Sequence, residues 1–297
     1  MDLKTAVTQL ESRLDNEMKQ YYGDSGRLGE AVLYSVLGGG KRIRGLLPWA
    51  TSLMVEQDTP EHVFAASIAL EMIHAYSLIH DDLPSMDDDD FRRGQPSNHK
   101  VYGEATAILA GDALLSDSFG FYVEKAKESL GPRQLAHAVA LISQAIGSRG
   151  MVQGQSLDIN WTDKKGQKIN QSQLEQIHHL KTGKLFEISF KLGLIQKDPS
   201  TIEMFAPLAT QFGLLFQIVD DYRDGADDFS QLGKTPGKDI EQGKSTYLTT
   251  KGKEQTLLEI KDIYEQCLGL IDQIDQKFSG DSSLLRNILQ KVVSNIL

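Results

Sequence analysis

The chain has a single cysteine, Cys267, among its 297 residues, and it lacks several patterns that would assign it to other classes of protein. One thiol cannot build an internal disulfide framework, which fits a reducing compartment. No stretch has the roughly 18–20 uninterrupted apolar residues that a membrane span needs. The N-terminal segment is mixed in charge and has no apolar run of the kind found in secretory signals. We therefore expect a cytoplasmic protein with no stable membrane insertion.

The alternation typical of β-strands is nearly absent, and helical periodicity takes its place. We expect helices over about 3–19, 27–37, 43–56, 61–82, 104–127, 133–147, 171–194, 201–224, 253–277 and 282–296. Three other segments, 83–103, 160–170 and 225–245, are expected to be loops. No repeat or linker composition interrupts the chain. The sequence therefore predicts one all-α domain over residues 1–297.

An excess of positive charge is also missing. The chain has 31 Lys and Arg against 41 Asp and Glu, which gives a formal net charge of -10. Such a protein has no bulk attraction to nucleic acid or anionic lipid, so we expect no nucleic-acid partner. If its substrate is an anion, local cations must hold it, either a bound metal or grouped Lys and Arg.

Two aspartate clusters each end a long apolar segment. The sequence DDLPSMD occupies residues 81–87, and DDYRD occupies residues 220–224. Carboxylates gathered in apolar surroundings repel one another and are costly to desolvate unless a cation offsets them. Oxygen ligands, in a chain with seven His and one Cys, favour Mg²⁺ over zinc or a redox metal. The sequence therefore predicts a magnesium site that holds phosphate groups.

The first cluster ends a helix that is apolar almost all round. Glu71, His74 and Asp81 are spaced by three and seven residues, so they share one helical face. Pro84 should loosen the helix after Asp81, and a bulged end could bring Asp87 beside it. The alternatives are an acidic surface loop and, for His74, a histidine satisfied within the core. The apolar character of the preceding segment argues against the surface loop.

Basic residues are grouped where an anion could meet them. The segment GGGKRIR, residues 38–44, places Lys41 and Arg44 on one face of a helix start, where backbone N–H groups also favour phosphate. Arg92 and Arg93 follow the first aspartate cluster, and two guanidinium groups can bind different phosphates. Any one of these residues alone fits a solvated surface. Their grouping indicates binding of an anion.

Together these motifs resemble the short-chain trans-polyprenyl diphosphate synthases, most closely the bacterial farnesyl diphosphate synthases. The resemblance covers nearly the whole chain through GGGKRIR, EMIHAYSLIHDDLPSMDDDDFRRGQPSNHK, AGDALL, GQSLDI, HHLKTGKLF, FQIVDDYRD and LGKTPGKDIEQGKSTY. It implies an isoprenoid synthase fold, a single bundle of about ten or more helices around a deep central cavity. It also implies a homodimer and about three Mg²⁺ ions per active site.

The same resemblance implies a role for individual residues. The implied metal ligands are Asp81, Asp82, Asp87, Asp220, Asp221 and Asp224. The implied contacts to an allylic diphosphate are Arg92, Lys181, Thr182, Gln217, Lys234 and Lys244. The implied contacts to isopentenyl diphosphate are Gly40, Lys41, Arg44, His74 and Arg93. Within these sets the residues implied to act in catalysis are Asp81, Asp87, Arg92, Lys181 and Asp220.

The implied reaction joins isopentenyl diphosphate to dimethylallyl or geranyl diphosphate. Metal ions and fixed cations stabilise the departing diphosphate, and the released pyrophosphate takes up the final proton. Tyr76 and Ser77 lie about one and a half turns before Asp81, where a ring would form the floor of the cavity. In the family, an aromatic ring here, together with the two-residue insertion in the first aspartate motif, accompanies a fifteen-carbon product. We therefore expect (2E,6E)-farnesyl diphosphate.

Two residues depart from the family pattern. Arg223 stands where Leu is common, and a guanidinium near the carboxylates is expected to weaken the third metal site. Gly45 follows Arg44 where Pro is common, which is expected to loosen that helix start. Three other functions stay open: a geranylgeranyl diphosphate synthase with a deeper cavity, a class I terpene cyclase, and a non-catalytic partner subunit. A second diphosphate site favours condensation over cyclisation.

Overall fold

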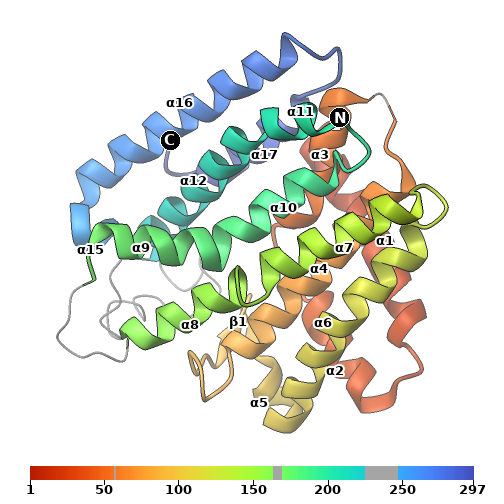
Figure 1. Ribbon diagram of the computed structural model, residues 1–297. Coiled ribbons are helices and arrows are strands. Elements are labelled where there is room, and N and C mark those ends of the chain that lie inside the picture. Colours follow the sequence, from red (N-terminus) through yellow and green to blue (C-terminus); the bar gives the residue numbers. More distant parts are fainter. Residues whose placement is uncertain (57, 163–168, 225–246) are drawn as a thin grey trace.

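The computed structural model describes residues 1–56, 58–162, 169–224 and 247–297, and its regular structure is helical apart from one short hairpin (Figure 1). The first part contains α1 (Leu3–Tyr22), α2 (Gly26–Val36), α3 (Ile43–Val55), α4 (Glu61–Asp81), β1 (Phe91–Arg92), β2 (Gln95–Pro96), α5 (Asn98–Tyr102), α6 (Glu104–Ala126) and α7 (Pro132–Ile146). The second part contains α8 (Met151–Thr162), α9 (Gln171–His178), the π-helical turn η1 (His179–Gly183), α10 (Lys184–Leu192), α11 (Pro199–Met204), α12 (Ala206–Asp224), α15 (Tyr247–Lys251), α16 (Lys253–Asp275) and α17 (Ser283–Val293). The prediction of an all-α fold is confirmed.

Most predicted helices begin and end within a few residues of the observed ones. The expected helix over 201–224 is two helices, α11 and α12, and the expected helix over 171–194 contains the π-helical turn η1. The loop expected over 83–103 holds the hairpin and α5. Helix α8 was not predicted, because Gly150 and Gly154 lower the helical propensity of a segment without a clear apolar stripe.

Local sequence accounts for many of these boundaries. Asp2 caps α1 by accepting a hydrogen bond of 3.0 Å from the Thr5 backbone N–H, and Asp198 caps α11 in the same way through Thr201. Along α1 the apolar residues recur every fourth position and turn one stripe to the interior. This buried stripe consists of Ala6, Leu10, Leu14, Met18 and Tyr22.

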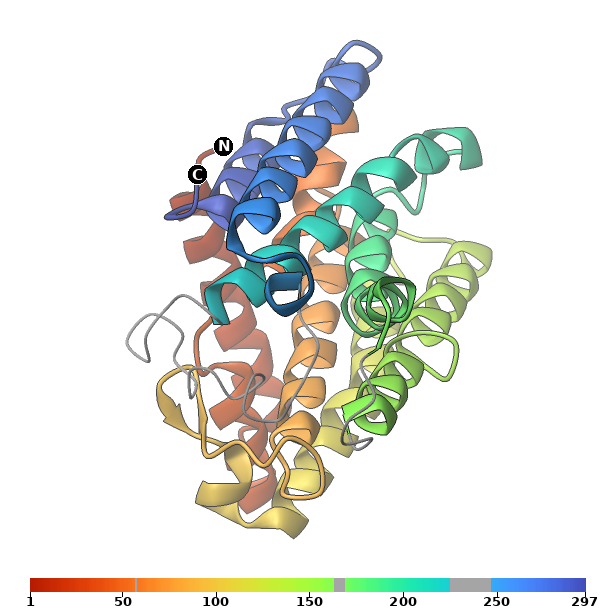
Figure 2. The same ribbon diagram turned by 90° about the vertical axis from the view of Figure 1, so that its left-hand side faces the viewer.

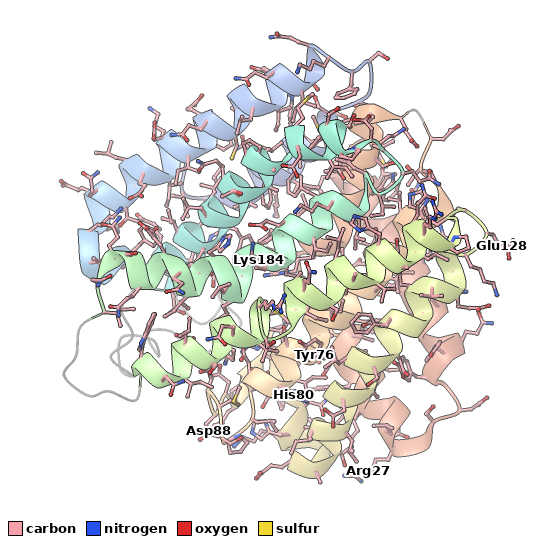
Figure 3. All side chains as sticks on the ribbon, in the orientation of Figure 1. Arg27, Tyr76, His80, Asp88, Glu128 and Lys184 are labelled. Carbon is pink, nitrogen blue, oxygen red and sulfur yellow. The ribbon has the colours of Figure 1, made fainter. Side chains whose placement is uncertain are left out.

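Helix α4 runs through the interior of the bundle, and nearly all of its faces are buried (Figure 2). Its Tyr76 is only 5% exposed, whereas Arg27 and Glu128 lie at the periphery of the molecule (Figure 3). Two stretches, Glu61–Asp81 and Pro199–Asp224, are long and apolar enough to span a membrane by length and composition, both with a mean hydropathy of 1.4. In α4, 78% of that window is buried inside the protein. Burial in a core produces the same apolar composition as a membrane does.

The buried apolar residues form two clusters. One gathers side chains from α3, α12, α16 and α17, and the other gathers side chains from α2, α4, α6 and α7. Residues of both clusters line a cavity: Ile43 and Leu174 come from the first, and Tyr76 and Leu185 from the second. The fold therefore places the candidate site where the two halves of the core meet.

Candidate active site

A cavity of about 830 Å³ opens where α4 and α12 end. Its size is within the usual range of small-molecule sites, about 300–1,000 Å³. Of the predicted site residues that the structure describes, all but Asp82 line it. These lining residues are Gly40, Lys41, Arg44, His74, Tyr76, Ser77, Asp81, Asp87, Arg92, Arg93, Lys181, Thr182, Gln217, Asp220, Asp221 and Asp224. Two predicted contacts, Lys234 and Lys244, lie outside the described residues.

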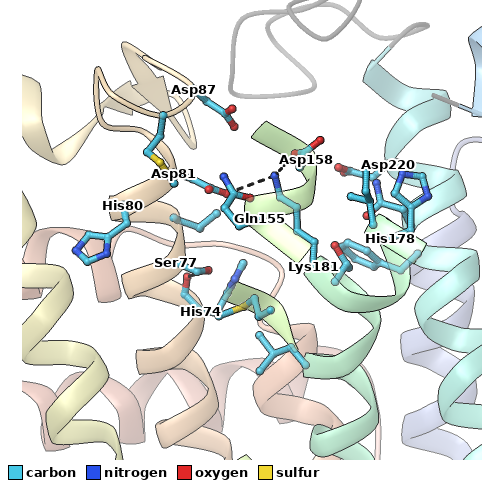
Figure 4. Close-up of a pocket in the computed structure, with 18 of the residues that line it drawn as sticks. His74, Ser77, His80, Asp81, Asp87, Gln155, Asp158, His178, Lys181 and Asp220 are labelled. Carbon is cyan, nitrogen blue, oxygen red and sulfur yellow. Dashed lines mark hydrogen bonds and ion pairs between the residues drawn. The ribbon is translucent and has the colours of Figure 1, made fainter. Parts of the chain in front are cut away.

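The two aspartate clusters face the cavity from opposite sides. Figure 4 shows Asp81 and Asp87 on one side and Asp220 on the other. Helix α4 ends at Asp81, and the chain then folds back so that the Asp87 N–H donates to the Asp81 carbonyl oxygen at 2.9 Å. This reversal is the bulged helix end that the spacing of Asp81 and Asp87 required. It brings both residues to one wall of the cavity.

Lys181 lies between the two walls. Its ammonium is 2.6 Å from the Asp158 carboxylate and 3.9 Å from that of Asp81 (Figure 4). Burial opposes the charge on Lys181, but Asp81 and Asp158 outweigh this effect and raise the lysine pKa. Burial likewise raises the pKa of Asp81, and Lys181 opposes that rise. A half-buried cation therefore offsets the first acidic wall.

A close helix contact positions Lys181. It belongs to η1, a single π-helical turn of the kind that often marks functional sites. Gly154 of α8 packs against this turn, and a Cβ there would lie only 2.2 Å from the Lys181 backbone nitrogen. Glycine at 154 thus lets α8 approach closely enough for Asp158, one helical turn further on, to reach the lysine.

Helix α8 adds polar residues to the cavity wall for which the sequence predicts no role, among them Gln155 and Asp158. Both belong to the GQSLDI motif, residues 154–159. At a spacing of three residues they share a helical face, and that spacing is the signal that could have identified them. His178 also lines the cavity.

Asp221 of the second acidic cluster has partners on several helices. Asp221 is 7% exposed and accepts hydrogen bonds from the Gln217 amide at 2.8 Å and the Tyr247 N–H at 2.9 Å. His178 stacks on the Tyr247 ring, and its Nε2 lies 3.9 Å from Asp221. Asp221 thus ties α12 to α9 and α15. Gln217, predicted to contact a diphosphate, orients this carboxylate as well as lining the cavity.

Arg223 is next to the second aspartate cluster along the chain, but it binds the end of α17. Its guanidinium donates hydrogen bonds to the carbonyl oxygens of Val292, at 2.9 Å, and Ser294, at 2.8 Å, and Arg223 does not line the cavity. It therefore stabilises the C-terminal end of α17 through carbonyl groups that have no partner within that helix. In the described structure the side chain is directed toward α17 and away from the cavity.

Arg44 and His74 form the centre of a basic cluster beside the first acidic wall. The Arg44 guanidinium lies over the rings of Phe186, at 4.6 Å, and Phe216, at 5.3 Å, and its Nη1 is 3.3 Å from His74 Nε2. Burial, together with Arg44 and Arg93, lowers the pKa of His74 well below its ordinary value. His74 is therefore neutral, and because arginine only donates, Nε2 accepts and Nδ1 carries the proton.

A short hairpin directs Arg92 and Arg93 to different partners. The turn residues Arg93 and Gly94 have φ of 54° and 77°, the conformation of a two-residue hairpin turn. Arg93 packs on Gly40, where a Cβ would lie 3.0 Å from its guanidinium carbon. Arg92 instead binds Asp82, with its Nε 3.0 Å from a carboxylate oxygen, and Asp89 at 3.2 Å.

Asp82 differs from the other predicted metal ligands. It is 2% exposed, does not line the cavity, and its carboxylate is occupied by Arg92. Because burial removes water from the Asp82 carboxylate, its charge needs a partner, which Arg92 supplies. The contacts of Asp82 are those of a residue that positions Arg92.

The apolar end of the cavity begins below Asp81. The Tyr76 ring lines it and is 5% exposed, and burial together with Asp81 raises the pKa of Tyr76 to about 12. Ser77 donates a hydrogen bond of 2.9 Å to the His74 carbonyl oxygen. In Figure 4, Ser77 and His74 lie deeper than the aspartates. The cavity thus combines a charged mouth with a wall that also includes apolar side chains, among them Leu174, Ile177 and Leu185.

The donor set can hold magnesium only together with a ligand. Among the residues that the structure describes, no group of three or more His, Cys, Asp or Glu side chains could hold a metal ion by itself. Mg²⁺ is commonly bound through one or two carboxylates, with water and substrate phosphates in the remaining positions. Asp81 and Asp87 on one wall and Asp220 on the other fit that mode of binding.

Comparison with known proteins identifies the family. Residues 26–278 match the polyprenyl synthetase family. The chain belongs to this family. It is therefore a prenyltransferase, and the catalytic class predicted from the sequence is confirmed.

Individual relatives of this polyprenyl synthetase make different products. It is 38% identical over 277 residues to farnesyl diphosphate synthase of Haemophilus influenzae, with 92% of both chains covered. It is 44% identical over 229 residues to chloroplastic geranylgeranyl pyrophosphate synthase 3 of Arabidopsis thaliana, which covers 76% of this chain and 63% of that relative. The chain thus spans less than two thirds of the plant enzyme's length.

Solved structures share the fold. A crystal structure of an FPP/GFPP synthase from Zymomonas mobilis superposes with a TM-score of 0.83 and 31% identity, over 98% of this chain and 99% of that one. A geranyltransferase from Helicobacter pylori, crystallised with magnesium and isoprenyl diphosphate, gives a TM-score of 0.80 and 27% identity over 97% and 96% of the two chains. The predicted isoprenoid synthase fold is confirmed.

Proposed function

We propose that this polyprenyl synthetase condenses isopentenyl diphosphate with dimethylallyl diphosphate and then with geranyl diphosphate, and releases (2E,6E)-farnesyl diphosphate and pyrophosphate. One observation supports this most: Asp81 and Asp220 face each other across the cavity mouth, with the Lys181 ammonium between them. Opposed carboxylates around a cation suit an anion held through divalent metal. A single acidic patch on an open surface would not.

Asp81, Asp87 and Asp220 would hold magnesium together with the allylic diphosphate, and the metal would stabilise the departing diphosphate as a Lewis acid. We assign Asp221 and Asp224 to supporting positions, since both are buried in α12. Lys181 and Arg92 would contact diphosphate oxygens directly, with Thr182 and Gln217 beside them. The geranyltransferase of Helicobacter pylori was crystallised with magnesium and isoprenyl diphosphate, which supports magnesium as the metal. We propose about three Mg²⁺ ions per active site.

Isopentenyl diphosphate would bind at the basic cluster of Gly40, Lys41, Arg44, His74 and Arg93. Because His74 accepts from Arg44 through Nε2, its Nδ1–H is the group available to donate to a phosphate oxygen. The double bond of this substrate would then lie toward the allylic carbon. The allylic C–O bond breaks with its electron pair leaving on the diphosphate, and the new C–C bond takes its electrons from the double bond. The proton lost at the end goes to the released pyrophosphate.

Product length would be set by the apolar end of the cavity. Tyr76, with Ser77 beside it, occupies the wall toward which a growing chain would extend from Asp81. A buried ring at this position stops the chain sooner than a small residue would. This supports a fifteen-carbon product.

The activity is tested by incubation of the chain with isopentenyl diphosphate and each of the three allylic starters, dimethylallyl, geranyl and farnesyl diphosphate, with and without Mg²⁺. We expect Mg²⁺-dependent release of pyrophosphate with the first two starters and accumulation of farnesyl diphosphate. Release of a cyclic hydrocarbon in the absence of isopentenyl diphosphate would identify a terpene cyclase instead. No turnover with any starter would indicate a non-catalytic subunit.

A second candidate is synthesis of geranylgeranyl diphosphate. The observation in its favour is the 44% identity to the chloroplastic enzyme of Arabidopsis thaliana. The same incubation separates the two functions, because a geranylgeranyl diphosphate synthase would consume farnesyl diphosphate as a starter. Accumulation of a twenty-carbon product would favour this candidate.

Three further features are part of the proposal. We propose one catalytic domain over residues 1–297, a cytoplasmic location, and a homodimer. The family match over residues 26–278 supports a single domain. Two apolar side chains of α6 support the homodimer, since Ile108 is 44% exposed and Leu109 is 57% exposed. Sedimentation of the purified chain would test the dimer.

A further inference from the structure

Glu71 is a buried carboxylate beneath the basic cluster. Its side chain is 2% exposed, and it accepts hydrogen bonds from the Gly45 backbone N–H at 2.9 Å and from Arg42 Nη1 at 3.1 Å. Gly45 is the third residue of α3, and the first N–H groups of a helix have no partner within it. A carboxylate of α4 therefore caps the N-terminus of α3, where negative charge is favoured.

Arg42 links this cap to the loop before α3. Its backbone has φ of 52°, a left-handed conformation that is disfavoured for a residue with a side chain. Its guanidinium, with the side chain 3% exposed, donates to the Val36 carbonyl oxygen at 3.0 Å as well as to Glu71. Glu71 thus stabilises the turn that carries Lys41 on one side of Arg42 and Arg44 on the other.

Gly45 allows the carboxylate to approach. A Cβ at this position would lie 2.9 Å from Glu71 Cγ and 3.0 Å from Glu71 Oε1. The proline that is common in the family has no N–H to donate. Glycine at this position is expected to loosen the start of α3. The hydrogen bond from the Gly45 N–H to Glu71, which a proline could not donate, opposes this loosening.

The negative charge of Glu71 also affects two arginines of the basic cluster, Arg44 and Arg93. Burial lowers the pKa values of Arg44 and Arg93 to about 10, and for each of them Glu71 is the strongest influence in the opposite direction. Glu71 therefore helps to keep two half-buried guanidinium groups charged beside the cavity.

We propose that Glu71 is a positioning residue for the isopentenyl diphosphate site. Its carboxylate fixes the start of α3 through Gly45 and Arg42, and this determines where Lys41 and Arg44 meet the diphosphate. This inference rests on the proposed function. It assigns Glu71 no contact with the reacting atoms, since its effect reaches the substrate through Arg42 and Gly45.

The test compares Glu71→Gln with Ser67→Ala. The glutamine keeps an oxygen for Gly45 but loses the charge and one acceptor, whereas Ser67 is a buried residue one turn earlier on α4, bonded to Val63. We expect Glu71→Gln to raise the KM for isopentenyl diphosphate about tenfold, because a charge-assisted hydrogen bond is lost. The KM for geranyl diphosphate should stay within about twofold of the wild-type value. Ser67→Ala should change neither KM.

Gly45→Ala provides an independent variant, since it leaves Glu71 in place and displaces its carboxylate with a Cβ. We expect the same selective rise in the KM for isopentenyl diphosphate. The dissociation constant of isopentenyl diphosphate alone, measured by calorimetry, gives a readout that does not depend on turnover. An equal rise in both KM values, or unchanged binding by both variants, would overturn the inference. If the wild-type chain does not bind isopentenyl diphosphate, the proposed function itself fails.

Discussion

The ammonium of Lys181 lies 3.9 Å from the carboxylate of Asp81, although the two residues come from different helices. The same ammonium is 2.6 Å from Asp158, so one half-buried cation lies close to two carboxylates. It is held at the cavity mouth by the π-helical turn η1 and by the close approach of α8. A diphosphate that enters between the acidic walls would therefore find both the carboxylates that bind metal and a fixed positive charge.

Replacement of Lys181 by Met should lower kcat/KM by about 10²–10³-fold, since one fixed contact to a developing anion contributes that much. Lys184→Met is the matched control, because Lys184 is three residues further along the chain, at the start of α10, pairs with Glu187 at 2.9 Å and does not line the cavity. Steady-state kinetics of both variants checks the prediction. A similar loss in the two variants would show that the position of Lys181 has no special role.

Tyr76→Ala should lengthen the product, because removal of the ring extends the apolar end of the cavity. We expect products beyond fifteen carbons, measured by chromatography of the dephosphorylated alcohols. Tyr76→Phe is the control, since it keeps the ring and removes a hydroxyl that is buried without a hydrogen-bond partner. If Tyr76→Ala and Tyr76→Phe give the same chain length, Tyr76 is not the floor.

Gly154→Ala should reduce both activity and stability. The added Cβ would lie 2.2 Å from the Lys181 backbone nitrogen, so α8 must move away from η1 and carry Asp158 with it. We expect a loss of about 1–3 kcal/mol in the free energy of unfolding, the usual cost of overpacking. The control is Gly269→Ala in α16, where nothing lies within 4 Å of the added carbon. It should stabilise the helix by about 0.5–1 kcal/mol. Denaturant unfolding should therefore show a lower free energy of unfolding for Gly154→Ala and a higher one for Gly269→Ala.

Stability should fall as the pH drops below about 6.5, and His62 should contribute to this. Burial lowers its pKa to about 4, so in that range the unfolded chain takes up a proton that the folded chain does not. By linkage, His62 alone should decrease the free energy of unfolding by about 2 kcal/mol between pH 7 and pH 5. His62→Leu should remove this part of the pH dependence, and His137→Leu, at an exposed position, is the control. Urea unfolding at pH 7 and pH 5 measures the free energy of unfolding of each variant. An identical change between the two pH values in both variants would contradict the prediction.

Sequence periodicity predicts most of the helices, because a buried stripe such as that of α1 follows from the spacing of apolar residues along the chain. It also placed Glu71, His74 and Asp81 on one face of α4, and all three line the cavity. Helix α8 could not be found in this way, since packing against η1 stabilises a segment whose glycines disfavour a helix.

Side-chain direction was the part that local sequence could not predict. Arg223 is next to the second aspartate cluster along the chain, yet its partners Val292 and Ser294 are near the C-terminal end. Glu71 caps a helix that begins 28 residues earlier, at Ile43. Asp82 sits beside Asp81 but is turned to Arg92. In each case the deciding contact is distant in sequence, and only the tertiary structure brings the partners together.

The central claim is that Asp81 and Asp220 hold one and the same diphosphate through Mg²⁺. Calorimetric binding of pyrophosphate, with and without Mg²⁺, tests it on the wild-type chain, on Asp81→Asn, on Asp220→Asn and on the double variant. Asp90→Asn, an exposed residue of the same loop paired with Lys100 at 2.7 Å, is the control. We expect pyrophosphate binding that requires Mg²⁺ and a loss of affinity of about tenfold or more in each single variant. The coupling energy between the two substitutions should exceed about 0.5 kcal/mol. Pyrophosphate affinity that does not depend on Mg²⁺, or losses that simply add in the double variant, would contradict the claim.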